Sequence, residues 1–144
     1  MKVAIKRIDK TLSLPSYQTK GAVAFDLCAR QDIIIKPHTL GYIPTNVIIK
    51  TPPGHVLILA PRSSMPKRGL IHPHGIGLVD ADYCGEEDEL MLQVFNITKK
   101  SVTVARGERI GQAMLVKFTR VSRWEEKSTM HKKSRGGFGS TGVA

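Results

Sequence analysis

A segment near the middle of the chain combines glycines with a carboxylate and a tyrosine. Gly75 and Gly77 come first, Asp80 follows an apolar pair, and Tyr83 lies three residues further on. Glycine lets a backbone approach a bound molecule closely. A carboxylate beside such a molecule can take the proton from an attacking water. The segment therefore predicts a ligand pocket, and the two carboxylates just before Tyr83, Asp80 and Asp82, are candidates for metal binding or proton transfer.

One further segment carries groups that suit a polyphosphate, and another is read as a turn. Arg62, Ser63 and Ser64 follow an apolar run, where a planar guanidinium and two hydroxyls can bind neighbouring oxygens. Gln112 lies in the segment 106–113, which is typical of a hairpin turn that enters a strand. The chain has no GxxxxGK[ST] motif, so a P-loop nucleotide hydrolase is excluded.

Asp26 and two histidines are weaker signals when each is read alone. Asp26 lies in the apolar stretch 24–27, where the ordinary interpretation is a turn or capping aspartate. His72 and His74 offer two imidazoles, but no second ligand pair with zinc-binding spacing accompanies them. We interpret them as loop histidines.

The glycine-rich end of the chain allows two interpretations. Residues 135–142 combine Arg135 and Phe138 with four glycines. Such a mixture is typical of RNA-binding arms, in which an aromatic ring stacks on bases. The same segment suits a strap over a nucleotide, with Arg135, Ser140 and Thr141 facing its phosphates.

Short strands must position these groups. Apolar or alternating runs predict strands at 33–35, 47–49, 56–59, 90–95, 102–104 and 110–118. Many short strands with frequent turns favour a sandwich, jelly roll or barrel. We expect an all-β domain over residues 1–124 and a flexible arm over 125–144, because apolar residues become sparse there.

Composition limits the class of protein. A chain of 144 residues with 41% hydrophobic and 24% charged residues is typical of one globular domain. It has no apolar run of about 18 residues, so a membrane-spanning helix is not expected. Two cysteines and the absence of a signal-like start favour a reduced, cytoplasmic protein. The net charge of +10 suggests an anionic partner, although six of the 12 acidic residues lie within 80–89.

Taken together, five segments resemble the motifs of the trimeric dUTPase family. They lie in the family's order at 24–27, 61–64, 77–86, 107–112 and 135–142, and span nearly the whole chain. The resemblance implies a distorted β jelly roll that assembles as a homotrimer with shared active sites. It also implies Mg²⁺-dependent hydrolysis of dUTP to dUMP and pyrophosphate. That activity limits uracil incorporation into DNA and supplies dUMP for dTMP synthesis.

The resemblance further implies roles for individual residues. Asp80 matches the general base, and Tyr83 matches the ring that packs under the deoxyribose. Phe138 matches the aromatic that stacks on uracil, and Asp26 the carboxylate that holds the metal through water. The other expected contacts with the nucleotide come from Arg62, Ser63, Ser64, Gly75, Gly77, Gln112, Arg135, Gly139, Ser140 and Thr141.

Two alternatives stay open. Ser64 stands where the family usually has glycine, and this serine pair resembles the dCTP deaminases, which share the fold. The deaminases carry a catalytic Glu three residues before the position of Asn96, whereas this chain has Gln93, which cannot act as a base. A basic nucleic-acid-binding β-barrel is a second alternative. Its support is the positive charge, but aromatic residues are only 6% and show no interleaving with basic residues along a strand.

Overall fold

The computed structural model describes residues 1–137. These residues form short strands and a single 3-10 turn, which confirms the all-β prediction. No helix among them is long and apolar enough to cross a membrane. In chain order the elements are β1 (Ala4–Arg7), β2 (Phe25–Cys28), β3 (Ile33–Ile35), β4 (Leu40–Pro44), β5 (Val47–Lys50), β6 (His55–Pro61), η1 (Pro66–Arg68), β7 (Leu70–Ile71), β8 (Gly77–Val79), β9 (Met91–Asn96), β10 (Val102–Val104) and β11 (Arg109–Lys117).

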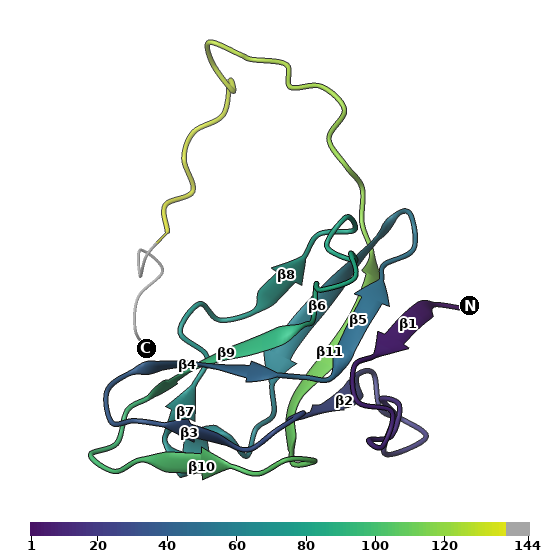
Figure 1. Ribbon diagram of the computed structural model, residues 1–144. Helices are drawn as coiled ribbons and strands as arrows, with labels where there is room; N and C mark the ends of the chain where they lie inside the picture. Colours follow the sequence, from purple (N-terminus) through teal and green to yellow (C-terminus); the bar gives the residue numbers. More distant parts are fainter. Residues whose placement is uncertain (138–144) are drawn as a thin grey trace.

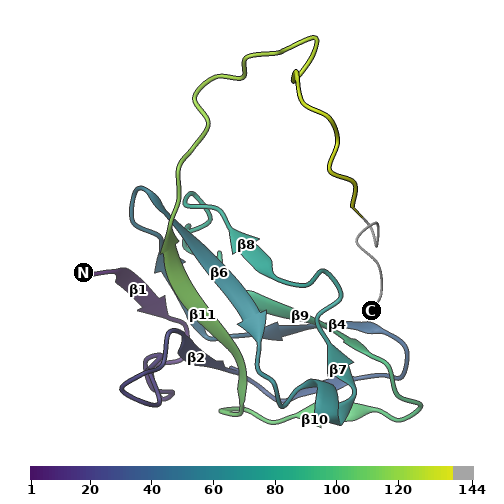
Figure 2. The ribbon, with the colours of Figure 1, turned by 180° about the vertical axis from the view of Figure 1, so that it is seen from behind.

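Two antiparallel sheets lie against each other (Figures 1 and 2). The larger has the order β2–β11–β6–β8, and the smaller has the order β4–β9–β7. Two ribbons, β1–β5 and β3–β10, complete the fold. Strands that follow each other in the chain therefore do not pair in these sheets, and residues distant in the chain meet across strands.

The core lies between the two sheets. Leu57 and Leu59 of β6 and Leu92 and Val94 of β9 are at most 4% exposed. Residues between them on the same strands are less buried, because successive side chains of a strand point to opposite faces. Each sheet thus has one face in the core and one outer face.

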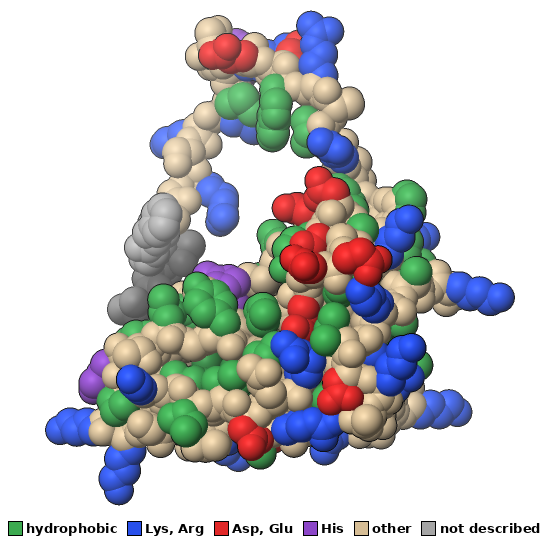
Figure 3. Space-filling model, viewed as in Figure 1, with side chains coloured by type: hydrophobic (Ala, Val, Ile, Leu, Met, Phe, Trp, Pro, Cys, Tyr) green, Lys and Arg blue, Asp and Glu red, His purple; other side chains and the backbone are tan. Residues whose placement is uncertain are grey.

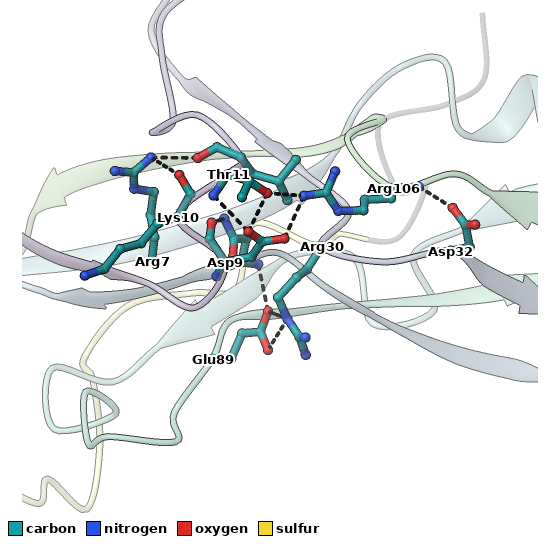
Figure 4. Close-up of polar contacts among 10 residues, drawn as sticks. Arg7, Asp9, Lys10, Thr11, Arg30, Asp32, Glu89 and Arg106 are labelled. Atoms are coloured by element: carbon teal, nitrogen blue, oxygen red, sulfur yellow. Dashed lines mark hydrogen bonds and ion pairs between the residues drawn. The ribbon is translucent and has the colours of Figure 1, made fainter.

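A polar network joins the N-terminal segment to two loops (Figure 4). Asn46, in the turn between β4 and β5, has a φ of 70°, a left-handed conformation that asparagine tolerates. Its side chain accepts the Asp9 N–H at 2.6 Å and donates to the Asp9 carbonyl at 3.0 Å. Arg106 donates to the Asp9 carboxylate at 2.6 Å, and this bond holds the pKa of Asp9 well below its ordinary value. The network therefore fixes the chain's first loop against the β4–β5 turn and the loop before β11.

The chain leaves the body of the fold after β11 (Figures 1 and 2). Phe118 still donates its N–H to the Gly54 carbonyl at 3.1 Å. Residues 118–137 are exposed throughout, and Trp124 is 84% exposed. The domain boundary between residues 124 and 125 stays a prediction.

Gly69 offers a test of the packing behind η1. It ends η1 with a φ of 77°, and an added Cβ would overlap the methyl group of Thr98. Gly54 has a φ of 72° with open space around it. We expect Gly54→Ala to lower the free energy of unfolding by about 1–2 kcal/mol through backbone strain alone. Gly69→Ala should lose about 1–3 kcal/mol more through overpacking. Urea unfolding at one fixed protein concentration measures both, and equal losses would contradict the packing.

Candidate active site

A cavity of about 270 Å³ opens beside β8 and the start of β9, and we call it the β8 cavity. Asp80, Tyr83, His72 and His74 line it, together with Gly77. The rest of its lining is apolar: Leu59, Leu78, Val79, Leu90 and Met91. Apolar walls with a few polar groups are typical of a small-molecule site.

Local hydrogen bonds shape the loop that carries Asp80 and Tyr83. The Tyr83 N–H donates to the Asp80 carbonyl at 3.1 Å, which closes a turn directly after β8. The Tyr83 hydroxyl donates to the Glu89 carbonyl at 3.2 Å, and the residue stays 41% exposed. Asp80 is exposed, so its carboxylate is accessible to water. The loop thus presents a carboxylate and a tyrosine ring to the same cavity.

A tight turn brings the two histidines to the cavity. The Gly75 N–H donates to the His72 carbonyl at 3.2 Å, and Gly75 has a φ of 80°, which favours glycine. The two imidazoles pack edge to face with ring centroids 4.2 Å apart. Both ring nitrogens of His72 are buried without a partner among the described residues, and this burial lowers its pKa. Both histidines lie in the loop between β7 and β8, as expected from the sequence, and both line the β8 cavity.

A second pocket, of about 260 Å³, surrounds Asp26, and we call it the Asp26 pocket. It brings together Asp26 of β2, Arg62 and Ser63 after β6, and Gln112 of β11. Its other lining residues are Gln18, Thr19, Ala22 and Ala24. Three of the five sequence segments thus meet at one place.

Asp26 is paired with two arginines. Arg109 Nη1 lies 3.1 Å from Asp26 Oδ2, and Arg62 Nε lies 3.6 Å from Asp26 Oδ1. The Asp26 side chain is only 11% exposed, whereas those of Arg62 and Arg109 are 32% and 46% exposed. Two guanidiniums against one carboxylate leave a net positive charge, which favours a bound anion.

An irregularity in β11 allows this arrangement. Arg109 pairs with Cys28 and Gly111 with Leu27, so the register shifts by one residue before Gln112 reaches Asp26. Strict alternation would send side chains three residues apart to opposite faces. The bulge turns Arg109 toward Asp26, although Gln112 already lies opposite Asp26 on the neighbouring strand.

The turn after β6 is held by backbone bonds and one buried side chain. The Arg62 N–H donates to the Ile110 carbonyl at 3.2 Å, and the Met65 N–H donates to the Arg62 carbonyl at 3.0 Å. Met65 is 1% exposed, while Ser63 and Ser64 are exposed. Ser63 lines the Asp26 pocket, and Ser64 is not among its lining residues.

The donor set suits a metal only in part. No group of three or more His, Cys, Asp or Glu side chains within residues 1–137 could hold a metal ion. Asp26 is the one carboxylate in the lining of its pocket. Mg²⁺ usually keeps several waters and binds one or two carboxylates together with substrate phosphates. Asp26 therefore fits an ion that a polyphosphate brings with it.

Asp80 and Arg62 are well separated in this chain. Val79, the residue before Asp80, pairs with Leu57, and Arg62 follows the end of β6, five residues after Leu57. Five residues of extended strand span roughly 17 Å. The two pockets also share no lining residue. A single chain therefore keeps Asp80 and Arg62 apart.

Other predicted residues lie elsewhere. Gly77 lines the β8 cavity, and Gly75 shapes the turn beside it. Arg135 is exposed on the segment beyond β11 and belongs to neither pocket. Phe138, Gly139, Ser140 and Thr141 lie outside the described residues.

Sequence reasoning missed two contributors. Arg109 was not predicted as a site residue, because only the bulge in β11 brings it to Asp26. Glu89 was not predicted as a structural residue, yet it is 6% exposed. Its position directly before the apolar run 90–92 was the only available signal that it enters the core.

Comparisons with known proteins indicate the family of the chain. A family model for dUTPase matches residues 10–142. A deoxyuridine 5'-triphosphate nucleotidohydrolase of Dictyoglomus turgidum is 37% identical over 150 residues and 99% of both chains. The one of Rickettsia typhi is 36% identical over 149 residues, which cover 99% of this chain and 98% of the relative.

Solved structures show the same fold. The crystal structure of dUTPase from Streptococcus mutans has a TM-score of 0.75 at 28% identity, over 83% of this chain and 98% of the other. A dUTPase variant of Staphylococcus bacteriophage 80alpha with dUpNHpp has a TM-score of 0.81 at 22% identity, over 99% of both chains. The second likeness, at that identity, shows the fold alone.

The fold and the sequence lead to the same family. The likeness to these solved structures confirms the predicted jelly-roll type of β fold. The family model covers nearly the whole chain, and two relatives exceed 30% identity along almost their full length. The chain belongs to the dUTPase family.

Proposed function

We propose that this protein hydrolyses dUTP to dUMP and pyrophosphate. The observation that carries the proposal is the meeting of Asp26, Arg62 and Gln112, from three distant segments, around one pocket suited to an anion. The family of the chain supports the same reaction. Its physiological role would be to limit uracil incorporation into DNA and to supply dUMP. The cytoplasmic location expected from the sequence stays a prediction.

Asp80 is the proposed general base. Hydrolysis at the α-phosphate needs a water held in line with the phosphorus and a group that accepts its proton. Asp80 is an exposed carboxylate at the mouth of a cavity whose apolar walls suit a nucleoside. The Tyr83 ring, anchored through its hydroxyl, packs under the deoxyribose and leaves no room for a 2′-hydroxyl.

Arg62, Ser63, Gln112 and Arg109 are the proposed phosphate ligands. Their guanidinium, hydroxyl and amide groups line or border the positively charged Asp26 pocket. Ser64 lies in the turn after β6 that holds Arg62 and Ser63, and Gly75 lies in the turn beside the β8 cavity, where the nucleoside is proposed to bind. Bound Mg²⁺ would offset charge on the triphosphate, with Asp26 holding it through water.

The two pockets serve one substrate only if different copies of the chain provide them. Asp80 must lie within reach of the phosphorus whose neighbouring oxygens Arg62 binds. The roughly 17 Å of strand between their positions prevents this within one chain. We infer a homotrimer in which the β8 cavity of one subunit faces the Asp26 pocket of the next.

Exposed apolar side chains support such an assembly. The outer face of β4–β9–β7 carries Leu40, Tyr42, Ile71 and Met91, each between 37% and 58% exposed. Figure 3 shows hydrophobic side chains gathered over β4 and β9. Monomeric proteins rarely leave large contiguous apolar patches open to water. A second copy of the chain is the proposed cover.

A deaminase is disfavoured by the position of Gln93. Its side chain lies on that outer face and donates to the Tyr42 hydroxyl at 2.8 Å. It lines neither the β8 cavity nor the Asp26 pocket. Gln93 therefore has neither the chemistry nor the location of a catalytic base.

The direct test is a substrate panel. The purified protein with Mg²⁺ should release pyrophosphate from dUTP, while dCTP, dTTP and UTP should be poor substrates. Mismatched bases leave buried polar groups unpaired, which weakens their binding. Pyrophosphate and ammonia are measured in parallel. Ammonia release from dCTP at a comparable rate would instead identify a deaminase.

Asp80→Asn tests the base. The amide has nearly the shape of the carboxylate but cannot accept the proton, so kcat should fall about 10²–10⁴-fold while nucleotide affinity is retained. Asp82→Asn, two residues away on the same exposed loop, is the matched control and should keep most of the activity. If Asp80→Asn keeps more than about a tenth of kcat, the base is another residue.

Truncation after Ser134 tests the arm. The described residues of the arm are exposed and have no place in the core, so the melting temperature and the oligomer mass should not change. Activity should be mostly lost, because Arg135, Phe138, Ser140 and Thr141 are the proposed clamp on the base and phosphates. Gly137→Pro in the full chain should impair activity through reduced flexibility alone. Full dUTP hydrolysis by the truncated chain would show that the arm has no part in catalysis.

A further inference from the structure

One buried carboxylate has no part in the mechanism described above. Among the acidic residues at 86–89, Glu86 and Glu87 are exposed, whereas Glu89 is 6% exposed. An ionised side chain in the interior is unfavourable unless it is paired and hydrogen-bonded. The contacts of Glu89 therefore show which parts of the fold its buried carboxylate joins.

The Glu89 carboxylate holds two separate parts of the fold together (Figure 4). Arg30 Nε donates to both of its oxygens, at 2.9 and 3.1 Å. The Asn46 N–H donates to Oε1 at 2.7 Å. The same ion pair raises the pKa of Arg30. Charge-assisted bonds of this kind are stronger than neutral ones, and here the carboxylate is buried while the Arg30 side chain is 27% exposed.

The partners of Glu89 are themselves fixed. The Arg30 N–H donates to the Pro44 carbonyl at 2.8 Å. Asn46 is held by two side-chain hydrogen bonds to the Asp9 backbone and one from Ile8 N–H to its carbonyl at 3.0 Å. Glu89 thus docks onto a rigid part of the fold.

The other end of Glu89 reaches the candidate active site. Its carbonyl accepts the Tyr83 hydroxyl at 3.2 Å, which is the hydrogen bond that anchors the ring lining the β8 cavity. Within the loop 80–88 the remaining backbone–backbone bonds are local. At its tip, Lys6 pairs with the Glu86 carboxylate and donates to the Glu86 carbonyl at 3.1 Å, and both side chains are exposed. Surface ion pairs of this kind contribute little to stability.

We propose that Glu89 is a positioning residue: its ion pair with Arg30 holds the carbonyl to which the Tyr83 hydroxyl donates, and so sets the place of the ring under the sugar. This inference rests on the proposed dUTP hydrolysis. The ring then excludes a 2′-hydroxyl only while Glu89 is docked. Loss of the Glu89–Arg30 ion pair should therefore appear as lost discrimination between dUTP and UTP.

The test compares kcat/KM for dUTP and UTP in three single variants and one double variant. Glu89→Gln keeps the size of the side chain and removes its charge. Tyr83→Phe keeps the ring and removes only the anchoring hydroxyl, so it should destabilise the fold less than Glu89→Gln does. Both should lower the dUTP/UTP ratio about 10- to 100-fold, chiefly through a higher kcat/KM for UTP, because the displaced ring no longer excludes the 2′-hydroxyl. Glu86→Gln, which removes the charge of an exposed neighbour, should leave the ratio unchanged.

The Glu89→Gln/Tyr83→Phe double variant shows whether the two residues act through one bond. Its loss should be no greater than that of the larger single variant, because coupled residues are non-additive. An unchanged dUTP/UTP ratio in Tyr83→Phe would overturn the proposal, even if Glu89→Gln fails to fold. A Glu89→Gln variant that melts earlier but keeps its ratio would leave Glu89 with a purely structural role. If the wild-type protein does not cleave dUTP at all, the proposed function fails instead.

Discussion

The length of β6 is the constraint on which the rest of the site depends. An extended strand cannot bring its two ends together. Asp80, which follows the residue paired with Leu57, therefore stays far from Arg62, which follows the other end of β6. Under the proposed function, each chain then has a nucleoside half and a phosphate half that cannot face each other. A second copy is the proposed complement of each site. The uncharged, partly exposed outer face of β4–β9–β7 is consistent with this need, because it would be unusual on a monomer.

The two pockets differ in charge. The Asp26 pocket keeps two arginines around one carboxylate, so it stays positive and attracts phosphate. The Asp80 loop is acidic, and its one buried carboxylate, Glu89, is neutralised by Arg30. A buried pair of this kind is weak evidence for stability, since desolvation offsets much of the attraction. Its proposed value is geometric, because it holds the carbonyl to which the Tyr83 hydroxyl donates.

The sequence predicted the strands with uninterrupted apolar runs, including β3, β5, β6, β9, β10 and β11, close to their observed bounds. It did not predict β1, β2, β4, β7 and β8. These are short, or contain charge, glycine or proline, as in Leu40–Pro44, and they become strands only because a partner strand pairs with them. Motif order identified Asp26, Arg62 and Gln112 as candidates before any geometry was known. Arg109 needed the β11 bulge, and Glu89 needed its partners Arg30 and Asn46, which are distant in the chain.

The most direct test of the shared site is complementation between two inactive variants. Asp80→Asn damages only the β8 cavity, and Arg62→Ala damages only the Asp26 pocket. The two are mixed in equal amounts, unfolded together and refolded, and dUTP hydrolysis is compared with that of each variant refolded alone. If neighbouring subunits supply the two halves, about a quarter of the sites receive both intact residues, and activity returns to about that fraction of wild type. A mixture no more active than its components would show that one chain holds the complete site.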